Sequence, residues 1–65
     1  MLVLWAVKIG EPDYFENVIF ESETNNETDI KNAMKQAKLN GYDRFRIARY
    51  SDIPDKPDFV KTIRI

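Results

Sequence analysis

The chain of 65 residues contains neither cysteine nor histidine. Without cysteine it can form no disulfide and offers no thiolate ligand to zinc. Without histidine it lacks the side chain that most often binds metals or acts as a general base near neutral pH. A domain of this size is close to the lower limit for a single hydrophobic core. It must therefore rely on tight packing or on self-association.

The same absences argue against catalysis. Ser22 and Ser51 have no histidine to activate them, and the two glycines, Gly10 and Gly41, form no phosphate-binding loop. The acidic segments at residues 21–27 and 52–58 lack the ligand spacing and central glycine of a calcium loop. We expect no enzyme, no catalytic residue, no metal, no cofactor and no small-molecule substrate.

Long hydrophobic runs are also missing, so we expect no membrane partner. Residues 1–9 are apolar, but no basic leader precedes them and no small-residue cleavage site follows. The sequence therefore does not predict a secretory signal, and we expect a cytoplasmic protein.

What remains is the composition of one globular domain spanning residues 1–65, with 43% hydrophobic and 32% charged residues. The net charge of −1 hides an asymmetry between the two halves. Residues 1–32 carry seven acids and two bases, whereas residues 33–65 carry eight bases and four acids. Either the halves neutralise each other in the fold, or one presents a charged binding face, such as an acidic mimic of nucleic acid.

Four strands and one helix are predicted. Residues 2–9 are rich in β-branched and aromatic side chains and end at Gly10. Turn-forming residues at 10–13 then lead into a second strand at 14–21, so the two strands should form a hairpin. Residues 44–50 alternate between apolar and basic side chains and predict a third strand. Two prolines make residues 51–58 a loop, and residues 59–65 predict the last strand.

The helix is predicted between the second and third strands. Thr24 or Asn26 can cap its beginning, and Asn40-Gly41 is typical of a helix end. Apolar residues recur in between at the spacing of one buried stripe. They are Ile30, Ala33, Met34 and Ala37.

The order β-β-α-β-β predicts an α+β domain with a four-stranded sheet and the helix packed on one face. In length and element order this layout resembles the β-grasp arrangement of small immunoglobulin-binding domains, in which the first and last strands pair in parallel. The alternative is an all-antiparallel sheet. No sequence signature of that family is present, so the resemblance implies no function.

The first strand carries the strongest functional indication. A sheet covered by one helix should have one apolar face, yet both faces of this strand are apolar. Side chains that point away from the helix would form an exposed patch of the size that implies a binding partner. The predicted interface residues are Val3, Trp5, Val7, Ile9, Phe15 and Ile19.

Three explanations of this patch stay open. It can form a homodimer, it can dock another protein, or it can be covered by the loop at residues 51–58 or by the chain ends. We expect a small, non-catalytic regulatory or inhibitor protein that works by protein–protein interaction, most simply as a homodimer. Accessory factors of phages and other mobile elements are often of this kind.

A nucleic-acid-binding domain is the alternative. Arginines and aromatic residues alternate along the third strand, and such surfaces bind phosphates and stack on bases. The candidate contacts are Arg44, Arg46, Arg49 and Tyr50. Arg44, Arg46 and Tyr50 should share one face. The acidic pI of about 5.3 argues against this function.

Overall fold

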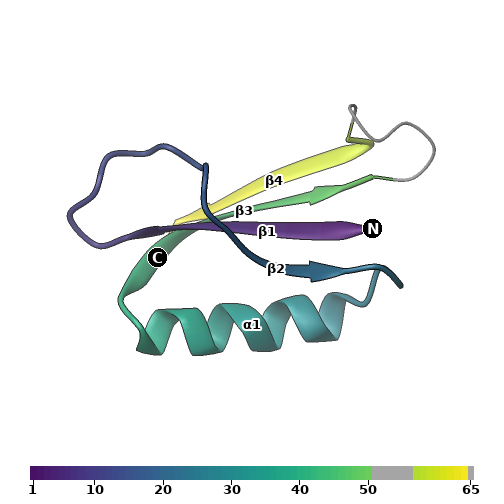
Figure 1. Cartoon of the computed structure of the whole chain (residues 1–65), viewed down its shortest axis with the longest axis horizontal. Coiled ribbons are helices and arrows are strands. Elements are labelled where there is room, and N and C mark those ends of the chain that lie inside the picture. Colours follow the sequence, from purple (N-terminus) through teal and green to yellow (C-terminus); the bar gives the residue numbers. More distant parts are fainter. Residues whose placement is uncertain (51–56, 65) are drawn as a thin grey trace.

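The computed structural model describes residues 1–50 and 57–64 and has the predicted α+β fold, with one helix and one four-stranded sheet (Figure 1). Its elements follow the predicted order. They are β1 (Leu2–Lys8), β2 (Val18–Ser22), α1 (Glu27–Leu39), β3 (Tyr42–Arg49) and β4 (Phe59–Arg64). Most of the predicted proline loop, residues 51–56, and Ile65 of the predicted last strand lie outside the described residues.

All pairings in the sheet are antiparallel, and the strand order is β2-β1-β3-β4. The all-antiparallel alternative is confirmed, and the β-grasp layout is wrong. β2 and β3 both pair antiparallel with β1, so they run in the same direction on either side of it. A connection between two strands with the same direction has to cross the sheet, and a helix is its usual form. α1 is that connection, and it crosses over β1.

Local signals fix both ends of α1, as predicted. The side chain of Asn26 accepts hydrogen bonds from the backbone N–H groups of Thr28 at 3.0 Å and Asp29 at 3.2 Å. These bonds satisfy donors that a helix start otherwise leaves free. Beyond the other end, Gly41 has a φ of +91°, a conformation that glycine adopts without strain.

The core lies between α1 and the two central strands. Leu4 of β1 and Phe45 of β3 are fully buried, and the helix contributes Ile30, Met34 and Ala37. These positions follow the apolar periodicity of each element, which is why the sequence predicted them. Leu39, on the other side of the helix, is exposed.

The first hairpin differs from the prediction. β2 begins only at Val18, so residues 14–17 belong to a long connection rather than to a strand. The pairing of β1 with β2 is also irregular, because Leu4 pairs with Phe20 whereas Trp5 pairs with Val18. The skipped residue, Ile19, forms a β-bulge, and a bulge breaks the alternation of side chains between the two faces.

We expect Ile30→Ala to lower the free energy of unfolding by about 2–5 kcal/mol, because it removes a buried side chain and leaves a cavity. Ile30 is 2% exposed, whereas Leu39 on the same helix is 82% exposed. Leu39→Ala is therefore the matched control and should change stability by less than about 0.5 kcal/mol. Urea unfolding followed by circular dichroism measures both. Equal losses in the two variants would contradict this packing.

Candidate interaction surface on the open sheet face

The side of the sheet opposite α1, here called the open face, is organised in rows by the strand register. The central row contains Trp5 of β1, with Val18 on one side and Arg46 and Thr62 on the other. Two further rows flank it, and the register places their members side by side. One contains Glu21, Val3, Ala48 and Val60, and the other contains Val7, Arg44 and Arg64.

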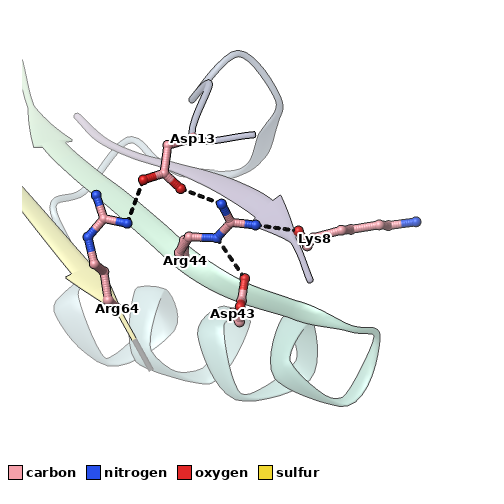
Figure 2. A network of polar contacts seen from close by, with 5 residues as sticks. All are labelled: Lys8, Asp13, Asp43, Arg44 and Arg64. Atoms are coloured by element: carbon pink, nitrogen blue, oxygen red, sulfur yellow. Dashed lines mark hydrogen bonds and ion pairs between the residues drawn. The ribbon is translucent and has the colours of Figure 1, made fainter. Parts of the chain in front are cut away.

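The connection between β1 and β2, residues 9–17, crosses one end of this face. Its Asp13 accepts hydrogen bonds from Arg44 of β3 and, at 2.6 Å, from Arg64 of β4 (Figure 2). Near its end, the carbonyl of Asn17 accepts a hydrogen bond from the backbone N–H of Ala6 at 3.1 Å. The long connection therefore acts as a strap over the row that contains Val7.

Arg44 is the centre of the polar network under this strap. Besides Asp13, its guanidinium donates to Asp43 at 2.8 Å and to the backbone carbonyl of Lys8 at 2.6 Å (Figure 2). Its side chain is only 14% exposed. Hydrogen bonds to the ionised form of a group favour that form. The hydrogen bond from Arg44 therefore lowers the pKa of Asp13, and the bond from Arg64 lowers it further. In turn, the hydrogen bonds to Asp43 and Asp13 raise the pKa of Arg44.

A second contact holds the strap further along. The ring of Phe15 lies under the guanidinium of Arg46, with the central carbon 5.4 Å from the ring centroid. This is a cation–π distance, and such contacts at exposed sites contribute about 0.5–1 kcal/mol. Phe15 is half-buried, while Arg46 is exposed beside Trp5. Arg46 therefore adjoins two aromatic residues, Phe15 through the ring contact and Trp5 through the strand register.

The structure brings only part of the predicted interface together. Val3 and Val7 lie on the open face but are 4% and 3% exposed, so both are buried within the chain. Trp5 is half-buried, and Ile9 is exposed at the start of the strap. Ile19 was wrongly placed on this face, because the bulge turns it to the other side of the sheet, where it packs against the core.

The sequence analysis did not predict two exposed residues of the open face. Val18 is 43% exposed beside Trp5, and Val60 of β4 is 47% exposed. Strict alternation along residues 14–21 placed Val18 with Phe20, on the helix side. No residue type in this segment signals the bulge that reverses this. Val60 follows from alternation alone, because it is two residues from Thr62 on the same face.

The basic strand is divided between the two faces. Arg44 and Arg46 lie on the open face, but Arg49 pairs with Leu2 and lines a groove on the helix side. Tyr50 follows β3, and its N–H donates to the carbonyl of Met1 at 2.8 Å. The four candidate nucleic-acid contacts therefore do not form a single surface.

Other candidate sites were sought within residues 1–50 and 57–64. This part of the chain contains no group of three acidic side chains arranged to hold a metal ion. Its single helix, with 13 residues, is too short to cross a bilayer. Comparison of the chain with protein-family models finds no match, and neither curated proteins nor solved structures show significant similarity to it.

We expect attachment of the strap to depend on pH. Because the pKa of Asp13 is lowered in the folded chain, its stabilising contribution is complete above the ordinary value of 3.8. It is lost as the pH falls through the lowered value. Asp13→Asn should remove this acid step and give, at pH 7, amide NMR shifts in residues 11–17 like those of wild type in acid.

Glu16→Gln is the control for that measurement. It changes a carboxylate in the same strap that has no ion-pair partner among the described residues. The acid step should stay in this variant. A step that survives in Asp13→Asn would show that Asp13 does not hold the strap.

Proposed function

We propose that this chain is a non-catalytic, cytoplasmic protein-binding module that acts through its open sheet face, and that the first partner of this face is a second copy of the chain. The observation that supports it is the central row, where half-buried Trp5 lies beside the exposed Val18. Val60, also exposed, is on the same face. Tryptophan and arginine dominate the energy of many protein interfaces, and here Trp5 and Arg46 are register neighbours.

The charges of this face favour self-association. Among the described residues, Arg46 makes a ring contact with Phe15, and neither Arg46 nor Glu21 has an ion-pair partner. Both lie on the open face, Glu21 at the β2 edge and Arg46 on β3. A two-fold interface brings a surface against its own copy, so Glu21 of one copy can meet Arg46 of the other. The same pairing would cover the apolar side chains between them.

The nucleic-acid alternative receives less support from this geometry. Arg44 is bonded to two carboxylates, and Arg49 lies on the opposite side of the sheet from Arg46. Proteins that bind single strands present several free cations along one groove. Among the described residues, no arrangement favours nucleic-acid binding over self-association.

Sedimentation over a range of concentrations tests the proposal. We expect a monomer–dimer equilibrium in wild type, and Trp5→Ala should raise its dissociation constant about 30-fold or more, corresponding to about 2 kcal/mol. Val60→Asp should have a similar effect with less risk to folding, because this side chain is nearly half exposed at an outer strand.

Leu39→Asp is the matched control, since it places the same charge on an exposed apolar site of α1, away from the open face. It should leave the dimer intact. Wild type that remains monomeric at millimolar concentration would rule out the homodimer. Equal weakening by Leu39→Asp and Val60→Asp would place the contact elsewhere.

A further inference from the structure

The helix side of the sheet contains a second surface, which the proposed dimer does not use. α1 contacts β1, β2 and β3, but no Cα atom of α1 lies within 8 Å of one in the described strand β4. In Figure 1, β4 likewise stands at the far side of the sheet from α1. A groove of about 450 Å³ lies here, with Ile30 and Met34 of α1 forming one wall. This groove is called the α1–β4 groove below.

The floor of the α1–β4 groove is apolar. It is made by Leu2, Ile47 and Ile63, one residue from each of β1, β3 and β4. Ile47 and Ile63 remain half-exposed although they pack against the core cluster. Covering them would remove further apolar surface from water, which is favourable by about 25 cal/mol per Å².

The strip of the sheet that α1 leaves uncovered has the width of one helix. α1 crosses over β1, and β4 lies two strands away, with neighbouring strands separated by about 4.8 Å. The separation between the position of α1 and β4 is therefore about 10 Å. Packed helices have axes about 8–10 Å apart. A second helix placed beside α1 would thus rest on β4 and touch α1 and the sheet together.

The rim of the groove is basic. Among the residues that the structure describes, three bases line it, namely Lys31 of α1, Arg49 of β3 and Lys61 of β4, together with one acid, Glu27, at the beginning of α1. None of the three cations forms an ion pair within the described residues. Opposite charges at the edge of an interface steer association and set which partner is accepted. A ligand for this groove should therefore be acidic along both sides of an apolar stripe.

From these observations we propose that the α1–β4 groove binds an acidic amphipathic helix of another protein. The apolar stripe of that helix lies on Ile47, Ile63 and Met34, and its carboxylates face Lys31, Arg49 and Lys61. This is the helix-in-groove mode of peptide recognition. The site is on the opposite side of the sheet from Trp5, so a dimer formed through the open face would present two such grooves.

A designed peptide pair provides the probe. The first peptide is a stapled helix of about the length of α1, with leucines at positions i, i+3, i+4 and i+7 and glutamates beside them. The second has lysine in place of every glutamate. Binding of labelled peptide is measured by fluorescence anisotropy, and its site by amide NMR shifts of the full chain.

We expect the acidic peptide to bind, to shift the amides of Ile47, Ile63 and Lys61, and to weaken as salt is added. The double variant Arg49→Glu, Lys61→Glu should weaken binding by about tenfold or more, corresponding to about 1.4 kcal/mol. Arg46→Glu, a single charge reversal on the open face, should leave binding of the acidic peptide to the groove unchanged. The lysine peptide should bind wild type at least about tenfold more weakly than the acidic one.

Other outcomes overturn the proposal. Shifts confined to the open face, or equal binding of both peptides, would show that the groove does not select an acidic helix. Added hydrogen-exchange protection along β4 would indicate an extended strand paired to the sheet edge instead. Concentration-dependent shifts of the groove residues without peptide would identify a second copy of the chain as the occupant. No binding at millimolar peptide would exclude the site.

Discussion

One helix of 13 residues has to cover one side of a four-stranded sheet. The helix is narrower than the sheet, and the rest of the structure depends on this difference in width. Because α1 connects two strands that flank β1, it must cross the central strand, where it buries Leu4 and Phe45. That position is good for the core but leaves β4 beyond the reach of α1 on the helix side. The groove beside α1 is thus a direct result of the topology.

On the open face, one row of the sheet is covered by a different means. Instead of a second layer of regular structure, a strap of irregular chain is held by charge. Asp13 joins Arg44 and Arg64, so an acid from the N-terminal half forms ion pairs with two bases from the C-terminal half (Figure 2). Surface ion pairs usually contribute little, but Arg44 is largely buried and forms several bonds at once. The strap covers the row that contains Val7, and the central row with Trp5 lies next to it.

Features encoded by near neighbours in the chain were predictable from the sequence. The capping by Asn26, the end of α1 at Gly41 and the buried stripe of the helix all depend on residues within a few positions of one another. The bulge at Ile19 was not predictable, because it depends on how β2 pairs with a distant strand. The role of Asp13 was not predictable either. The sequence indicated only a turn residue, and the two arginines that it binds are distant in the chain. Hence the apolar character of β1 was predicted, but not which of its residues stay exposed.

The bulge in β2 also makes the two outer edges of the sheet unlike each other. β4 pairs regularly with β3 along its whole length. The pairing of β2 with β1, in contrast, is interrupted between Val18 and Phe20. Edges of matching geometry and opposite charge, such as acidic β2 and basic β4, could otherwise join head to tail without limit. An interrupted ladder resists such growth, as bulged and charged edges do in many β-proteins. The bulge at Ile19 therefore makes the β2 edge a poorer template for strand addition than the regularly paired β4 edge.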